Sequence, residues 1–508
     1  MNETAKATGE NYGSRARRSA VWDFGGRLTI QGVVFASSLF LARLLTPADF
    51  GITTAARFFI TLATRLTQLG LNASLVRMKE LRPDHASSVF VVNLLAGALC
   101  FGALWMSSPW IGRYFGSNEV GAVLPYLAVT FLITPWGTVA SAMLTRHLQY
   151  KHSTAIQVLD TVSGTLLTLG LAFFGWGYWS LVYGPLFGAV LSTSAKLYAS
   201  PWRPSLLVTR RALSETIGFG LGFQAKNLLL FASANLDNVV VGRMLGVTSL
   251  GFYDKAYGLM HTLTNRMAFD ASLMRILAII QDEPDRFRRA VLKGIRATTL
   301  VSFPMLLTCA CLAHLIVPVL FGDQWHAAVE PFRVLSIVGM FRSVMRPVHA
   351  ANEALGAVWV QSAQQLVTVA VLVGGGAVGA RYGGVVGVAA GVLLAEVIHA
   401  LLAGDLLRRR SRVSPADLAS ACGPALLLSS FACASGLMVS VSLQSLGLLP
   451  ALDLMAGVAV TVVTYAVLLL WTPFREQERV IMEIVDDLAP RLRSLLPLGI
   501  LRRAPGKA

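Results

Sequence analysis

The sequence has few charged residues for its length. Only 14% of its 508 residues are charged, whereas 55% are hydrophobic. A soluble domain carries about 25% charged residues, so this composition excludes an ordinary soluble protein. Acidic residues are the scarcer kind, with 27 Asp and Glu against 43 Lys and Arg. Such a basic excess can indicate nucleic-acid binding. Here the basic residues fall in alternate loops between apolar segments, and no nucleic-acid partner is expected.

Cysteine and catalytic motifs are also scarce. The five cysteines lie in apolar segments without zinc-type spacing, which predicts packing roles and no metal or cofactor. No Ser-His-Asp, Walker or nucleotide-sugar motif is present, so the sequence predicts no enzyme. The glycine-rich stretch Gly374–Gly379 has neither a preceding strand nor a GK[ST] ending. It therefore predicts close helix packing or a bend instead of a phosphate-binding loop.

Long apolar runs recur along the whole chain, and each is long enough to cross a bilayer as a helix. They predict an all-α polytopic membrane protein with about 14 transmembrane helices. The expected spans are 24–45, 51–74, 86–108, 119–142, 153–174, 177–198, 214–244, 249–275, 292–318, 327–352, 357–379, 382–406, 416–442 and 448–472.

The basic residues predict how these spans are oriented. Loops rich in Lys and Arg alternate with loops that offer little beyond Arg113 and Arg381. Because basic loops remain in the cytoplasm, we expect both termini to be cytoplasmic. The predicted regions are an N-terminal tail (1–23), a six-helix N-lobe (24–205), a six-helix C-lobe (206–412), an additional helix pair (413–472) and a basic cytoplasmic tail (473–508).

The two lobes contain similar sequences. ARLLTPADFG (42–51) matches GRMLGVTSLG (242–251) at an offset of 200, and FGSNEVGAVLPY (115–126) matches FGDQWHAAVEPF (321–332) at an offset of 206. Several matches in the same order indicate an internal duplication. Six spans per copy make the repeats parallel, which predicts a pseudo-two-fold axis along the membrane normal and a substrate path between the lobes.

Polar residues inside the predicted spans are the candidate site. A charge at mid-bilayer costs about 2.5–3.5 kcal/mol, so such residues usually face protein or water. Basic residues outnumber acidic ones at this depth, which predicts a polar, net positive cavity; interhelical ion pairs are the alternative. The candidate substrate-binding residues are Arg57, Arg65, Gln68, Lys226, Asn235, His261, Arg266, Arg342 and Arg346. Asp237 is a candidate site for a coupling ion, Na⁺ or H⁺, and a structural ion pair is again the alternative.

Several motifs carry a family resemblance. ARLLTPADFG, LDNVVVGRMLG…LGFYDKAY and the two FG…P segments at 115–125 and 321–331 resemble the polysaccharide transporter (oligosaccharide flippase) family of the MATE/MOP superfamily, over roughly residues 20–410. The resemblance implies alternating access between two lobes. It also implies transfer of oligosaccharides linked to undecaprenyl pyrophosphate across the bacterial inner membrane, for lipopolysaccharide or exopolysaccharide biosynthesis. Polysaccharide polymerase or assembly proteins are the expected partners.

Two other functions stay open. A multidrug cation antiporter of the same superfamily would be expected to have an acidic cavity, because its substrates are cationic. A membrane glycosyltransferase or polymerase would be expected to carry a large periplasmic loop or catalytic acids. The basic residues within the spans and the short predicted loops favour the flippase.

Overall fold

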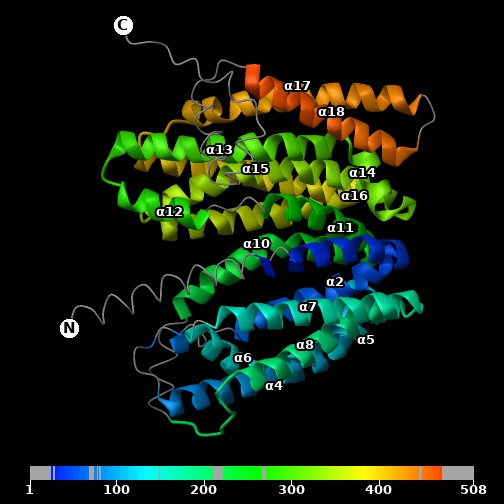
Figure 1. Cartoon of the computed structure of the whole chain (residues 1–508), viewed down its shortest axis with the longest axis vertical. Coiled ribbons are helices and arrows are strands. Elements are labelled where there is room, and N and C mark those ends of the chain that lie inside the picture. Colours follow the sequence, from blue (N-terminus) through cyan, green and yellow to red (C-terminus); the bar gives the residue numbers. More distant parts are fainter. Residues whose placement is uncertain are drawn as a thin grey trace. The chain divides into compact units, whose positions relative to one another are not determined.

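All regular elements that the computed structural model describes are helical (Figure 1). The described residues are 25–26, 29–67, 74–76, 78, 82–147, 149–209, 221–265, 270–445 and 449–471. Seven of the helices within them are long and apolar enough to cross a membrane, and a shorter apolar helix covers Thr29–Leu44. These findings confirm the prediction of an all-helical, multi-pass membrane protein.

The helices fall within or close to the predicted apolar ranges. After the helix at Thr29–Leu44 come α2 (Pro47–Thr67), α4 (Pro83–Phe115), α5 (Asn118–Ala128), α6 (Thr130–Arg146), α7 (Tyr150–Phe173), η1 (Gly177–Trp179), α8 (Ser180–Ala199), α10 (Leu221–Leu245), α11 (Val247–Asn265), α12 (Asp270–Ile279), α13 (Pro284–Cys311), α14 (Ala313–Phe321), η2 (Asp323–Ala328), α15 (Val329–Ala354), α16 (Val358–Arg410), α17 (Pro415–Gln444) and α18 (Pro450–Trp471).

Helix α16 is a hairpin of two helical arms. Gly384 has a φ of 57° and breaks the helix between them, a conformation that glycine adopts without a Cβ clash. Glycines on both arms allow their backbones to approach closely. A Cβ on Gly379 would lie 2.0 Å from the Gly387 carbonyl oxygen, and one on Gly391 would lie 2.5 Å from the Gly375 carbonyl carbon. The prediction that Gly374–Gly379 serves close packing is confirmed.

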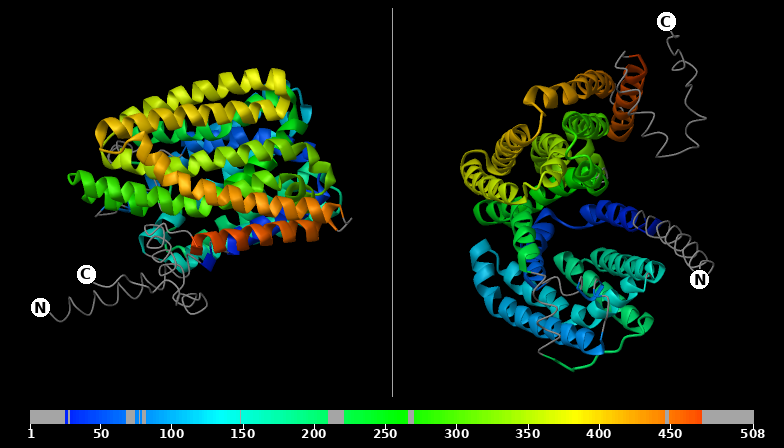
Figure 2. Two further views of the ribbon diagram at one scale, coloured as in Figure 1. Left: turned by 90° about the horizontal axis from the view of Figure 1, so that it is seen from above. Right: turned by 90° about the vertical axis from the view of Figure 1, so that its left-hand side faces the viewer.

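The chain forms two compact units. Unit 1 comprises Met1–Lys255, Leu320–Ala328 and Val369–Gly391, and unit 2 comprises Ala256–Val319, Val329–Thr368 and Val392–Ala508. In unit 1, α7 packs on α8, α4 packs on α5 and α6, and α2 contacts α5 and α10. In unit 2, α13 packs on α15 and α17, and α17 packs along α18 (Figures 1 and 2). The predicted lobe boundaries stay a prediction.

Within unit 1, the duplicated turns contact each other through equivalent glycines. Gly51 of α2 and Gly251 of α11 are matched by the offset of 200 residues. A Cβ on Gly51 would lie 1.7 Å from the Val247 carbonyl oxygen, and one on Gly251 would lie 1.9 Å from the Pro47 carbonyl oxygen. Each glycine thus lets the first turn of the other helix approach, and the contact is reciprocal.

The FG turns make a second reciprocal contact in unit 1. The indole N–H of Trp325, just after the second FG turn, donates to the Ala42 carbonyl at 2.7 Å. Beside the first FG turn, the Arg243 guanidinium donates to the Tyr114 carbonyl at 2.8 Å. Each FG turn thus contacts the helix end that precedes the duplicated turn of the other sequence copy. This exchange explains why Leu320–Ala328 belongs to unit 1.

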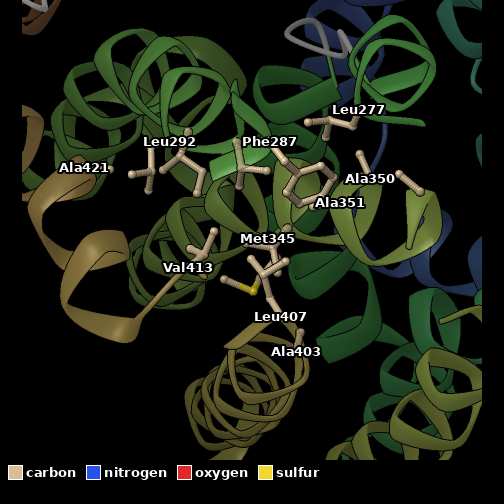
Figure 3. Packing of buried hydrophobic residues seen from close by; sticks show 14 of the residues in the cluster. Leu277, Phe287, Leu292, Met345, Ala350, Ala351, Ala403, Leu407, Val413 and Ala421 are labelled. Carbon is tan, nitrogen blue, oxygen red and sulfur yellow. The ribbon is translucent and has the colours of Figure 1, made fainter. Parts of the chain in front are cut away.

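The core of unit 2 lies where α12, α13, α15, α16 and the start of α17 meet (Figure 3). Phe287 is 1% exposed and packs with Leu277, Met345 and Leu407. Since lipid tails are as apolar as these side chains, close packing and polar contacts hold such helices together. One polar contact is at the start of α17, where Arg288 Nε donates to Asp417 at 3.1 Å.

Candidate functional site

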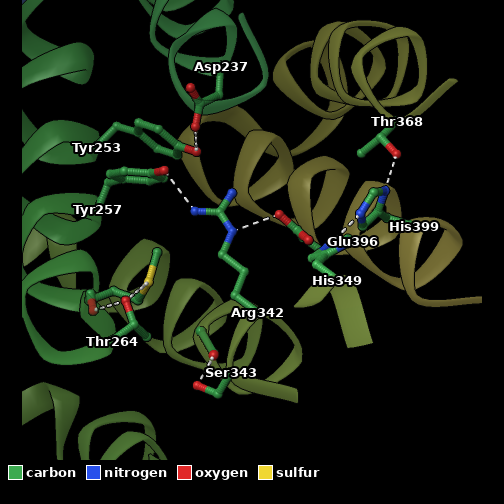
Figure 4. A network of polar contacts seen from close by, with 12 residues as sticks. Asp237, Tyr253, Tyr257, Thr264, Arg342, Ser343, His349, Thr368, Glu396 and His399 are labelled. Carbon is green, nitrogen blue, oxygen red and sulfur yellow. Dashed lines mark hydrogen bonds and ion pairs between the residues drawn. The ribbon is translucent and has the colours of Figure 1, made fainter. Parts of the chain in front are cut away.

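A polar network in unit 2 joins α11, α15 and α16 (Figure 4). Its centre is Arg342 on α15. Arg342 Nε lies 2.7 Å from Glu396 Oε1 on the second arm of α16, and a second guanidinium nitrogen donates to the Tyr257 hydroxyl on α11 at 2.7 Å. The guanidinium carbon also lies 5.4 Å from the Tyr257 ring centroid. Arg342 therefore links three helix segments.

The Arg342–Glu396 pair changes the electrostatics expected from the sequence. The Arg342 side chain is 21% exposed and that of Glu396 is 14% exposed. Ion pairing at this depth offsets much of the desolvation cost that either charge alone would carry. Arg342 is consequently neutralised by an acid, which is the interhelical alternative considered for it. An anion can use this guanidinium fully only if Glu396 moves away.

Two further candidates lie beside Tyr257 and Arg342. The imidazole of His261, one turn beyond Tyr257 on α11, stacks on the Tyr257 ring with centroids 5.9 Å apart, and it is exposed. Arg346 lies one turn beyond Arg342 on α15 and is half-buried. Both arginines interact electrostatically with His261. The structure therefore brings His261, Arg342 and Arg346 together.

A histidine pair continues the network along α15 and α16. His399 Nε2 lies 3.1 Å from His349 Nε2, and His399 Nδ1 lies 2.7 Å from the Thr368 hydroxyl (Figure 4). His399 is buried and His349 half-buried. Sequence reasoning did not include these residues among the candidates. Their spacing offered a signal, because His349 is seven residues from Arg342 and His399 is three from Glu396, which places each pair on one helix face.

The remaining described candidates lie in unit 1. Arg57 and Arg65 are both exposed on α2, and Arg57 donates to the Leu181 carbonyl at 3.1 Å. The Asn235 amide donates to the Phe231 carbonyl of its own helix at 2.9 Å. Buried Asp237 accepts a hydrogen bond from the Tyr253 hydroxyl at 2.8 Å. Tyr253 is thus a positioning partner for the candidate coupling-ion residue.

Three of the candidate side chains lie outside the part of the chain that the structure describes. Gln68 and Arg266 lie outside the described residues, and so does the side chain of Lys226, although its backbone is part of α10.

Unit 1 also contains a pocket of mixed polar and apolar lining that the sequence did not indicate. It has a volume of about 360 Å³, and its lining includes four hydroxyl residues of α6 and Lys196 of α8. The α6 residues are Thr134, Thr138, Ser141 and Thr145. Their spacing of three or four residues places them on one face. This combination of hydroxyl groups and an ammonium group suits a polar ligand.

Known proteins share both the sequence and the fold. A family model described as "Polysaccharide biosynthesis protein" matches residues 40–330. The chain is 23% identical to lipopolysaccharide biosynthesis protein WzxC of Escherichia coli (strain K12), over 75% of this chain and 79% of that protein. It is 26% identical to teichuronic acid biosynthesis protein TuaB of Bacillus subtilis (strain 168), over 63% of this chain and 66% of that protein.

The solved lipid II flippase MurJ, in its inward closed conformation, superposes with a TM-score of 0.64 and 11% identity, covering 88% of this chain and 98% of that one. At such identity the likeness shows the fold alone. The family model covers more than half of this chain, including both copies of the duplicated turn. The chain therefore belongs to the polysaccharide biosynthesis protein family and is a multi-pass membrane transporter of the MATE/MOP-like fold rather than an enzyme.

Proposed function

We propose that this protein moves oligosaccharides linked to undecaprenyl pyrophosphate across the bacterial inner membrane, for lipopolysaccharide or exopolysaccharide biosynthesis. Support comes from family membership and from relatives named for the biosynthesis of lipopolysaccharide and teichuronic acid. This substrate is a lipid whose pyrophosphate group carries the sugars. It requires cationic groups for the phosphates, polar groups for the sugars and a lateral path for the lipid tail.

The observation that carries this proposal is the set of arginines on α2 and α15, two helices that the sequence predicts to cross the membrane. Arg57 and Arg65 are exposed on α2, and Arg342 and Arg346 lie one turn apart on α15. Arginine donates two parallel hydrogen bonds to phosphate oxygens, so it suits a pyrophosphate better than lysine does. In this proposal several of the basic candidates hold the pyrophosphate, while Gln68, Asn235 and His261 contact sugar. A cationic drug would be repelled by the same groups, which disfavours the multidrug antiporter.

The proposed mechanism is alternating access by two parallel six-helix repeats, within about 14 crossings. Both termini are cytoplasmic, and the helix pair at 413–472 is an addition to the repeats. The reciprocal Gly51–Gly251 contact supports the duplication, because it joins equivalent positions. Asp237 takes part in coupling to Na⁺ or H⁺, and the assembly proteins that use the flipped unit are the partners.

The test is complementation of a flippase-deficient strain with Arg57→Ala and Arg65→Ala together. We expect polysaccharide export to fall sharply while the amount of protein in the membrane stays near that of the wild type, because Arg57 donates to a main-chain carbonyl and interacts with Asp254 without a direct ion pair, whereas Arg342 is paired directly with Glu396. Lysine at both positions should restore export only in part. Arg381→Ala is the matched control, since Arg381 is exposed near the α16 bend.

Arg342 requires a different design. Alanine there would leave Glu396 charged and unpaired, so Arg342→Gln is combined with Glu396→Gln. Full export by a protein that carries all four substitutions, at normal abundance, would overturn the proposed anion site.

A further inference from the structure

The pocket beside α6 and α8 in unit 1, here called the α6–α8 pocket, has walls that the chain's own contacts hold in place. Arg146 at the end of α6 donates to the Leu75 carbonyl at 2.9 Å and to the Met78 carbonyl at 2.6 Å. These bonds fix the segment that carries Val76, which lines the pocket. The volume of about 360 Å³ lies within the range of about 300–1,000 Å³ that is usual for ligand sites.

Most hydroxyl groups in this pocket offer acceptors and not donors. Thr134, Thr138 and Thr145 each donate their one hydrogen to the carbonyl four residues earlier on α6, at 2.9, 2.8 and 3.0 Å. Each oxygen keeps lone pairs that can accept from a further donor. The hydroxyl of Ser141, between Thr138 and Thr145 on the same face, makes no hydrogen bond to the described residues.

Lys196 is the donor of the pocket. It is half-buried near the end of α8, and its Cδ lies 3.1 Å from the position that a Cβ on Gly137 would take, so its stem lies against α6. Asp160 on α7 acts on the ammonium group electrostatically, but no described carboxylate lies within ion-pair distance of it. The ammonium group therefore has hydrogen bonds to give, while Asp160 offsets much of its charge.

The hydroxyl-bearing face of α6 points away from the exposed apolar face of that helix. Leu132 and Trp136 are 36% and 41% exposed. Each lies two residues from Thr134 in the sequence, which turns it by roughly 200° around the helix. A lipid tail would contact the apolar face, so the pocket on the other face is suited to a polar ligand.

The pattern of donors and acceptors selects the class of ligand. A carboxylate or a phosphodiester accepts from Lys196, but it has no hydrogen for the threonine oxygens. An ammonium compound donates to those oxygens, but Lys196 repels it. A sugar ring satisfies both, because each of its hydroxyl groups donates one hydrogen and also accepts through its lone pairs.

We propose that the α6–α8 pocket is a subsite for a neutral sugar ring of the lipid-linked oligosaccharide. The inference rests on the proposed function, which supplies the sugar. Lys196 donates to neighbouring hydroxyl oxygens of the ring, and the hydroxyl groups of the ring donate to Thr138 and its neighbours on the same face. In the predicted orientation the ends of α6 and α8 are cytoplasmic, so the pocket holds the sugar as the substrate enters.

The test measures whether sugars protect a cysteine in the pocket from a thiol reagent. Ser141→Cys is made in the full-length protein without its native cysteines, reconstituted in lipid nanodiscs and labelled with a water-soluble maleimide. Glucose, galactose, mannose and N-acetylglucosamine are added in turn. We expect at least one of these sugars to slow labelling, and sulfate or ethanolamine at the same concentration to leave it unchanged. His152→Cys, at an exposed position on α7, is the control and should label at one rate throughout.

Second substitutions in the Ser141→Cys protein identify the contacts. Lys196→Met should raise the sugar concentration that halves the labelling rate by about tenfold or more, the effect of losing one hydrogen bond from a charged group. Thr138→Val keeps the shape of the side chain without its acceptor and should raise that concentration by about two- to tenfold. Thr298→Val on α13 is the matched control, because Thr298 makes the same bond to a helix carbonyl at 2.9 Å outside the pocket.

Protection by sulfate and by no sugar would overturn the inference and indicate an anion site. If none of the four sugars protects, while the protein with Arg57→Ala and Arg65→Ala fails to export, the inference is wrong and the proposed function stands. Sugar protection together with full export by that protein would keep the pocket and contradict the proposed anion site. Protection that Lys196→Met and Thr138→Val leave unchanged would also overturn the inference. Should Ser141→Cys reduce the amount of folded protein, Thr145→Cys provides the same measurement.

Discussion

Replacing Gly251 by alanine tests the contact between the duplicated turns of α2 and α11. The new Cβ would lie 1.9 Å from the Pro47 carbonyl oxygen and 2.7 Å from its carbon. Ordinary van der Waals contact of a Cβ begins near 3.4 Å. The two helices must therefore separate by about 1.5 Å, the difference between these distances. No side-chain rotation can relieve the clash, because both atoms belong to the main chain.

The expected loss of stability is the balance of two effects. Overpacking typically costs about 1–3 kcal/mol, and a clash with main-chain atoms belongs at the upper end. Alanine recovers about 1 kcal/mol, because glycine is a poor helix former. We therefore expect a net loss of about 1–2 kcal/mol in the free energy of unfolding. The separation would also disturb the edge-to-face contact of Phe50 with Trp325, whose centroids are 5.4 Å apart.

The assay is unfolding of the purified protein in a mild detergent, with Gly258→Ala as the matched control. Gly258 lies two turns further along α11, and a Cβ there would meet nothing within 4 Å. This control should gain stability. In the variant with both Gly51→Ala and Gly251→Ala, the second substitution should cost less than the first, because the helices have already moved apart. A Gly251→Ala protein as stable as Gly258→Ala would refute the reasoning.

Two further outcomes follow from the structure. Arg342→Ala should destabilise the protein by up to about 3–5 kcal/mol, because it leaves Glu396 charged and unpaired. The double variant Arg342→Met with Glu396→Leu should restore most of the stability but not export. Equal stability of the single and double variants, measured by proteolysis in membranes, would contradict this expectation. For the orientation, a cysteine replacing exposed Asn118 should react with an impermeant thiol reagent in intact cells that lack the native cysteines, and one replacing exposed Arg289 should not. Labelling at 289 but not at 118 would reverse the topology.

The sequence predicts the helices well because a long apolar run can form few structures other than a helix in a membrane. The sequence does not predict the ends of helices that are extended by polar contacts. The span expected at 292–318 begins in the structure at Pro284, eight residues earlier. Hydropathy does not detect this first part of α13, where Arg288 pairs with Asp417, a residue 129 positions away. A hydropathy window measures transfer into lipid, whereas an ion pair between helix ends depends on their register.

In the candidate site too, the sequence predicts residues on each helix but not the contacts between helices. The sequence predicted that Arg342 lies within a membrane span, but its partner Glu396 lies 54 residues away on the far arm of α16. Their pairing depends on the bend at Gly384, which sets the register of the second arm. The Thr368–His399 contact spans 31 residues around the same bend. Sequence patterns give the face of each helix. Which faces meet is decided by the bend and by the glycine contacts near it.

The duplicated positions carry different chemistry, and this difference bears on how an anion would be held. The offset of 200 residues pairs Arg57 with Tyr257. Arg57 donates to a neutral main-chain carbonyl, whereas the Tyr257 hydroxyl accepts from Arg342, whose other partner is a carboxylate. An anion that displaces this carbonyl replaces one hydrogen bond from a charged group, of about 1.5–3 kcal/mol. An anion that displaces Glu396 must break a partly buried ion pair, unless another positive charge takes over the carboxylate. Arg57 interacts electrostatically with Asp254 without a direct ion pair, whereas Arg342 is held in a direct ion pair by Glu396, so an anion displaces less at Arg57 than at Arg342.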